Sequence, residues 1–96
     1  MGQRILVADD EPGLRMIYER TLSLKGHSVV TTETGDEALA LLRSGEPFDL
    51  LITDNSMPGT KGIDIGTIVK REFPQMPVIL ATADVDGKEM AKDAGL

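Results

Sequence analysis

The stretch FDLLITDNSMPG, residues 48–59, joins the pattern of a buried strand to a charged side chain. Its apolar run Leu50-Leu51-Ile52 leads through Thr53 directly into Asp54, and the chain then turns at Met57-Pro58-Gly59. A carboxylate left alone at the end of a buried strand costs free energy. We therefore expect Asp54 either to be solvated at the strand tip or to have a partner there.

Short apolar runs of the same kind recur along the chain, and a helical pattern follows each of them. The predicted strands are residues 5–8, 28–32, 50–53 and 78–81. The predicted helices run from Pro12 to Gly26, from a Thr34–Glu37 capping box to Gly45, from about Ile63 to Phe73, and from Lys88 to Ala94. Alternating strands and helices predict an α/β protein with a parallel sheet covered on both faces.

Composition sets the outer limits on class and function. The 96 residues predict one domain, and the net charge of −6 disfavours direct binding to nucleic acid or to a membrane surface. The chain has no Cys, one His and no apolar run long enough to span a membrane. Disulfides and thiolate metal sites are thereby excluded, and a cytoplasmic location is expected by default.

The ends of the predicted strands carry the polar groups. Asp9 and Asp10 follow the first strand, and Asp54 follows the third. In a doubly wound, flavodoxin-like sheet of order 2-1-3-4 these strands are neighbours, so the three acids converge. Their mutual repulsion would be relieved by a cation, and an all-oxygen ligand set suits Mg²⁺. The alternative is structural, because Asp9 or Asp10 could simply cap the helix that begins at Pro12.

Three segments in order resemble the receiver domains of two-component response regulators. They are ILVADDEP at residues 5–12, DLLITDNSMPGTKG at 49–62, and PVILATAD at 77–84. The resemblance implies a single receiver domain over residues 1–96 that accepts a phosphoryl group, with Mg²⁺, from a histidine kinase or phosphotransfer protein. It also implies a phosphoacceptor that assists its own phosphorylation and dephosphorylation rather than an enzyme.

The resemblance also assigns roles to single residues. It implies that Asp54 is the phosphoacceptor, that Asp10 binds the metal directly and Asp9 through water, and that Ser56 offers its backbone carbonyl to the metal. Thr82 matches the switch hydroxyl that moves to bind the phosphoryl oxygen.

The resemblance also assigns residues that control access and hydrolysis. Ala83 matches the small residue that leaves the acceptor open to large donors, and Ser56 and Asp84 fall where side chains tune dephosphorylation.

Receivers normally add a fifth strand, ending in Lys, and a fifth helix. The strand spacing would place that unit beyond Leu96, so we expect a C-terminally incomplete receiver without it.

Two other readings stay open. The chain could be a truncated or degenerate receiver that binds partners without efficient phosphorylation. A phosphatase or phosphotransferase of the haloacid-dehalogenase type is disfavoured, because that pattern needs an Asp two residues after the nucleophile and position 56 is Ser.

The sequence also predicts two features of the surface. The strand at 78–81 would be an apolar edge, which predicts a homodimer or strand exchange through it. Arg15, Arg20 and Lys25 are expected to form a solvated face of the first helix, with contact to a partner as the alternative.

Overall fold

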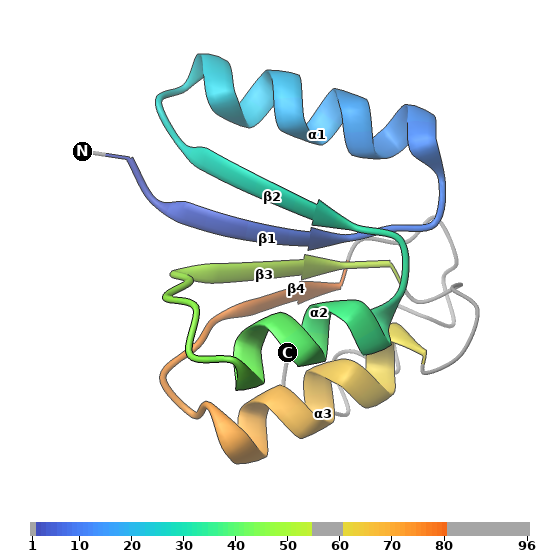
Figure 1. The fold of residues 1–96 in the computed structure, drawn as a ribbon, viewed down its shortest axis with the longest axis vertical. Helices are drawn as coiled ribbons and strands as arrows, with labels where there is room; N and C mark the ends of the chain where they lie inside the picture. Colours follow the sequence, from blue (N-terminus) through green and yellow to red (C-terminus); the bar gives the residue numbers. More distant parts are fainter. Residues whose placement is uncertain (1, 55–60, 81–96) are drawn as a thin grey trace.

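A computed structural model describes residues 2–54 and 61–80. Its elements are β1 (Arg4–Ala8), α1 (Pro12–Leu24), β2 (Ser28–Thr32), α2 (Gly35–Arg43), β3 (Leu50–Thr53), α3 (Gly62–Glu72) and β4 (Val78–Leu80). The strands form a parallel sheet of order β2-β1-β3-β4. In Figure 1, α1 lies over one face of the sheet, while α2 and α3 lie over the other. The predicted fold class and strand order are confirmed; Ala81 and the helix expected at 88–94 lie outside the described residues.

The register of the central strands decides which side chains face each helix layer. β1 pairs with β3 from Ile5–Leu50 to Ala8–Thr53. Because side chains alternate along a strand, one set faces α2 and α3 and the other faces α1. The first set packs with residues of α2 and α3 into the larger core, where Leu6 and Leu51 of the strands and Ile65 of α3 have no exposed surface.

The core under α1 is smaller. Its buried members are Ile5, Val7 and Ile52, with Tyr18 and Leu22 of α1 packed against them. No residue of α1 itself is fully buried. Leu14 and Ile17 belong to the apolar side that the sequence pattern predicts for this helix, yet they are 44% and 60% exposed. Of this apolar side, Tyr18 and Leu22 pack against the buried residues of the sheet.

The ends of the first two helices follow the predicted signals. The Thr34 side chain accepts a hydrogen bond from the backbone N–H of Glu37, and its hydroxyl contacts the Glu37 carboxylate. This caps α2 as predicted. Gly26 and Gly45 follow α1 and α2 with φ of 90° and 91°, a conformation that favours glycine.

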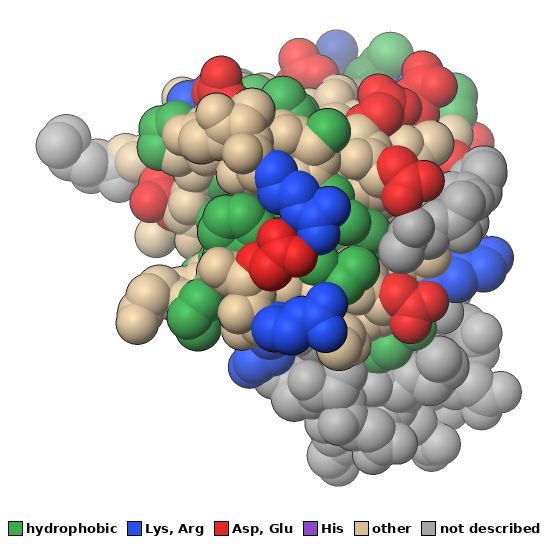
Figure 2. Space-filling view, turned by 60° about the horizontal axis from the view of Figure 1, so that its bottom comes forward, with side chains coloured by type: hydrophobic (Ala, Val, Ile, Leu, Met, Phe, Trp, Pro, Cys, Tyr) green, Lys and Arg blue, Asp and Glu red, His purple; other side chains and the backbone are tan. Residues whose placement is uncertain are grey.

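The outer surface over α2 and α3 is charged. Figure 2 shows Lys and Arg side chains interspersed with Asp and Glu side chains on this face. Arg43 of α2 holds Glu72 of α3 through two hydrogen bonds, of 2.9 and 2.6 Å. The pair raises the pKa of the Arg43 guanidinium and lowers the pKa of the Glu72 carboxyl. In the part of the chain described, no helix has both the length and the hydropathy of a membrane span.

Candidate functional site

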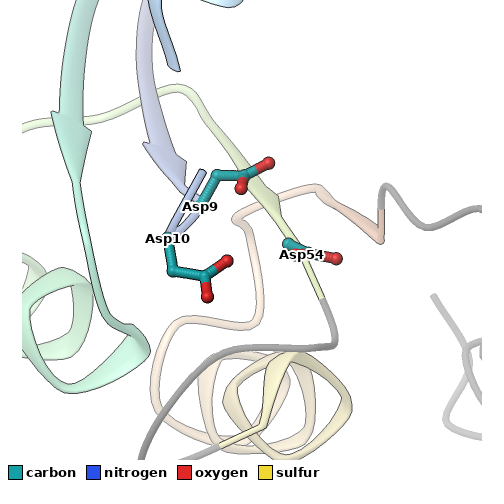
Figure 3. Close-up of side chains that lie close together, drawn as sticks. All are labelled: Asp9, Asp10 and Asp54. Atoms are coloured by element: carbon teal, nitrogen blue, oxygen red, sulfur yellow. The ribbon is translucent and has the colours of Figure 1, made fainter. Parts of the chain in front are cut away.

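Three carboxylates meet at the carboxyl ends of β1 and β3. Asp9 and Asp10 follow β1, and Asp54 follows β3, as Figure 3 shows. One carboxylate oxygen from each lies within 4.8 Å of those from the other two. The convergence that the sequence predicted is therefore present in the fold. At such a separation two like charges repel by about 1 kcal/mol in water and by about 4 kcal/mol where the effective dielectric constant is near 20.

Asp9 is the buried member of the cluster, with 2% of its surface exposed. Its carboxylate Oδ1 accepts a hydrogen bond of 2.9 Å from the backbone N–H of Glu11, the N-cap residue of α1. Asp9 thus helps to shape the start of the helix and also belongs to the cluster, so the structural and functional readings of this residue both apply. Burial, opposed by the Glu11 bond and reinforced by the charges of Asp54 and Asp10, raises the pKa of the Asp9 carboxyl.

Asp54 is fixed through its backbone. Its N–H donates to the carbonyl oxygen of Ala8 at 2.9 Å. The hydroxyl of Thr53, which is fully buried, donates to the carbonyl oxygen of Asp54 at 3.2 Å. The Asp54 side chain is half-buried, and within the described residues no hydrogen bond occupies its carboxylate. The main chain of Asp54 is therefore held by Ala8 and Thr53.

The charge of the cluster affects the pKa of Tyr18 in α1. Tyr18 packs against the small core under α1, which contains Ile5, Val7 and Ile52. Burial raises the pKa of the Tyr18 phenol, and the negative charges of Asp9 and Asp54 raise it further. The sequence pattern does not specify the distance of Tyr18 from the acids, because that distance depends on how α1 crosses the sheet.

Arg15 is the second residue whose role the sequence pattern missed. Its side chain is only 18% exposed, so the solvated face expected for this position is wrong. Its guanidinium donates a 2.8 Å hydrogen bond to the backbone carbonyl of Asp9 and lies 3.7 Å from the Glu33 carboxylate. The available signal was its position, one turn into a helix that starts beside the acidic pair.

The donor set selects the kind of ion that could bind. All three side chains offer oxygen, and neither nitrogen nor sulfur is among them. Hard cations that keep part of their water shell, Mg²⁺ above all, prefer such ligands. Oxygens on an octahedral Mg²⁺ are about 3 to 4 Å apart, from its metal–oxygen distance of about 2.1 Å. The cluster therefore fits this ion with small side-chain rotations.

Four of the predicted site residues lie outside the described residues. They are Ser56, Thr82, Ala83 and Asp84. Their placement relative to the three acids stays a prediction from the sequence.

Comparison with known proteins identifies the family. Residues 5–95 match the family described as "Response regulator receiver domain". The chain is 39% identical over 82 residues to the DNA-binding transcriptional regulator NtrC of Salmonella typhimurium, covering 85% of this chain and 17% of that protein. It is 35% identical over 83 residues to the response regulator protein FleR of Pseudomonas aeruginosa, covering 86% of this chain and 17% of that protein. The chain thus corresponds to a small part of these relatives.

Solved structures agree in fold. The response regulator protein TrrA of Thermotoga maritima, in complex with Mg(2+)-BeF, superposes with a TM-score of 0.88 at 34% identity. The match covers 96% of this chain and 80% of that one. The chemotaxis response regulator CheY4 of Vibrio cholerae gives a TM-score of 0.87 at 27% identity, over 99% and 82% of the two chains. With the parallel sheet and the acidic cluster at its edge, these matches show that the chain belongs to the response regulator receiver domain family.

Proposed function

We propose that this chain accepts a phosphoryl group on Asp54 in Mg²⁺-dependent two-component signalling, from a histidine kinase or a phosphotransfer protein. The observation that carries the proposal is the meeting of Asp54 with Asp9 and Asp10 at the ends of β1 and β3. Phosphoryl transfer depends mainly on alignment and on neutralising charge, and this cluster offers a nucleophile beside a cation site.

Asp54 is the member of the cluster best suited to be the acceptor. Asp9 is buried, and one of its oxygens is already bonded to Glu11. Asp10 is exposed at the start of the β1–α1 connection, whereas Asp54 has its backbone held by Ala8. An acceptor must be both reachable and fixed, because misplacement of a reacting atom by about 1 Å can cost a hundredfold in rate.

The metal would be held by the same three acids. Asp10, the exposed acid, would bind it directly, while Asp9, whose Oδ1 is engaged by Glu11, would bind through water. Ser56 would add its backbone carbonyl. When bound, Mg²⁺ supplies positive charge against the oxygens of the transferring phosphoryl group.

The transfer itself is a displacement at phosphorus. A carboxylate oxygen of Asp54 forms a bond to phosphorus while the bond from phosphorus to the donor nitrogen breaks, and the electron pair of that bond leaves with the donor. The resulting acyl phosphate is later hydrolysed by water, which returns the Asp54 carboxylate. We assign Thr82 as the hydroxyl that responds to the new phosphoryl oxygens, Ala83 as the residue that keeps access open, and Ser56 and Asp84 as residues that tune hydrolysis.

On this proposal the chain is a phosphoacceptor that takes part in its own modification rather than an enzyme acting on a separate substrate. Its partners would be a kinase or phosphotransfer domain in the cytoplasm, without direct contact to nucleic acid or membrane. The interaction-module reading predicts partner binding that does not depend on Asp54, so phosphorylation of the chain separates the two readings.

The deciding experiment compares the wild-type chain with Asp54→Asn. Each protein is incubated with acetyl phosphate and Mg²⁺, and its intact mass is measured. The wild type should gain one phosphoryl group only when Mg²⁺ is present, and should lose it again after acetyl phosphate is removed, whereas Asp54→Asn should gain none. Asp64→Asn is the matched control, because Asp64 is an exposed acid on α3. Equal phosphorylation of Asp54→Asn and wild type would overturn the assignment, and absence of phosphorylation in both would favour the interaction module.

A further inference from the structure

The side chain of Arg15 connects three segments behind the acidic site. Arg15 lies in the second turn of α1, where its N–H donates to the Glu11 carbonyl at 3.0 Å. Its guanidinium donates to the backbone carbonyl of Asp9 at 2.8 Å and faces the carboxylate of Glu33, in the β2–α2 connection, at 3.7 Å. The side chain thus links the residue that follows β1 to the residue that follows β2.

This contact completes a set of restraints on Asp9. The N–H of Asp9 donates to the Thr32 carbonyl at 3.1 Å, and its Oδ1 accepts from the Glu11 N–H at 2.9 Å. Arg15 takes the remaining backbone group, the carbonyl oxygen. Both backbone polar groups of Asp9 and one oxygen of its carboxylate are therefore hydrogen-bonded, immediately before the exposed residue Asp10.

The guanidinium meets the backbone of Asp9 rather than its carboxylate. Bonded in this way, Arg15 leaves the acidic oxygens of the cluster for another cation, and the nearby Glu33 carboxylate partly balances the arginine charge. The repulsion among Asp9, Asp10 and Asp54 would otherwise push the β1–α1 connection away from β3.

We propose that Arg15 is a positioning residue for the cation site, holding the Asp9–Asp10 peptide in place through the Asp9 carbonyl, with Glu33 orienting the guanidinium. The inference rests on the proposed function, because the cation is the one assigned to the acidic cluster. Partners that orient metal ligands without touching the metal commonly change its affinity by about 10- to 100-fold when they are removed.

The sign of the effect separates positioning from simple electrostatics. Removing a positive charge near a cation site should tighten cation binding if charge alone matters. Removing a residue that positions the ligands should weaken binding despite the more favourable charge. Arg20 provides the matched control, since it lies on the same helix, is exposed, and its side chain makes no hydrogen bond or ion pair with any residue that the structure describes.

The experiment is an MgCl₂ titration of the full chain followed by amide chemical shifts in ¹H–¹⁵N spectra. The proteins are wild type, Arg15→Met, Arg15→Lys, Glu33→Gln and Arg20→Met, with the melting temperature of each measured without Mg²⁺. We expect about tenfold weaker Mg²⁺ binding for Arg15→Met and less than twofold change for Arg20→Met. Arg15→Lys, which keeps one donor, should recover part of the loss, and Glu33→Gln should weaken binding two- to threefold because its pair is exposed.

The possible results are distinct. Unchanged or tighter binding in a folded Arg15→Met would overturn the inference alone and reduce Arg15 to a local charge or a packing contact. A lower melting temperature with unchanged affinity would do the same. If Arg15→Met fails to fold, Arg15→Lys and Glu33→Gln decide, and wild-type affinity in both would count against the inference. No Mg²⁺-dependent shift in the wild type would overturn the proposed function, and this inference with it.

Discussion

The backbone N–H of Asp54 donates a hydrogen bond to the carbonyl oxygen of Ala8, with nitrogen and oxygen 2.9 Å apart. The bond extends the β1–β3 ladder one residue beyond the Ala8–Thr53 pair. Because Asp9 follows Ala8, this bond places the acids of the two strands side by side. The acidic site is thus a direct product of parallel strand pairing.

Tyr18 should report the charge of Asp54. The Asp9 and Asp54 carboxylates raise the pKa of the Tyr18 phenol, in addition to the effect of burial. Replacing Asp54 by Asn removes one of these charges, so the pKa of Tyr18 should fall toward its usual value. Tyr18 is the only tyrosine and the chain has no tryptophan, so phenolate absorbance in an alkaline titration measures it directly. Asp64→Asn on α3 should leave the curve unchanged, and identical curves for all three proteins would refute the coupling.

The metal-free protein should lose stability as Asp9 ionises. The pKa of Asp9 is raised in the folded chain above the value of 3.8 expected when unfolded. Its favourable contribution is therefore complete below pH 3.8 and is lost as the pH rises through the folded pKa. Asp9→Asn, which can keep the bond from Glu11, should gain stability relative to wild type over that window.

Urea unfolding of both proteins from pH 3.5 to 7, in EDTA, measures this difference. Saturating Mg²⁺ should reduce or reverse the advantage of Asp9→Asn, because the cation stabilises the charged carboxylate. A difference between the two proteins that stays constant with pH would contradict the raised pKa.

Stability should depend on the core between the sheet and the helices α2 and α3. Leu6 has no exposed surface, and Leu6→Ala should cost about 2 to 5 kcal/mol in the free energy of unfolding. That is a large share of the roughly 5 to 15 kcal/mol typical of a domain. Leu24 is 82% exposed, so Leu24→Ala should change the free energy of unfolding by less than about 0.5 kcal/mol. If Leu6→Ala and Leu24→Ala lost equal free energies of unfolding in chemical denaturation, Leu6 would not belong to the stabilising core.

β4 should promote self-association. It is the last strand in the described sheet, and Ile79 is 49% exposed on it. An apolar edge strand favours pairing with a second chain. Ile79→Lys should therefore lower the weight-average mass seen by light scattering after size exclusion. Met16→Lys is the control, since Met16 is 65% exposed on α1. A wild-type chain that is monomeric at high micromolar concentration would count against this prediction.

The sequence predicted most of the fold because its signals were local. The strands are marked by four apolar runs, and the helix ends by the Thr34 cap and the glycines after α1 and α2. The alternation of strands and helices along the chain then predicts a parallel sheet. Strand order then brought Asp9, Asp10 and Asp54 together, as the structure confirms. What the pattern could not give were contacts that depend on how α1 lies on the sheet.

Arg15 and the apolar side of α1 illustrate that limit. The partner of Arg15 is a backbone carbonyl, which has no side-chain signature in the sequence. Leu14 and Ile17 fit the helical period as well as Tyr18 and Leu22 do, but only the latter two face the sheet. Periodicity identifies an apolar stripe, whereas its orientation depends on the packing angle of the helix.

The Ala8–Thr53 register links the acidic site to the folding of the chain. A slip of β3 by one residue would turn Leu51 away from the core under α2 and α3 and would also move Asp54 away from Asp9. β1 and β3 lie far apart in the sequence, and such non-local pairing forms only after the entropy of closing the intervening loop has been lost. Site assembly and core assembly are thus one event, so cation affinity recovered during refolding would measure the fraction of chains whose central strands are correctly paired.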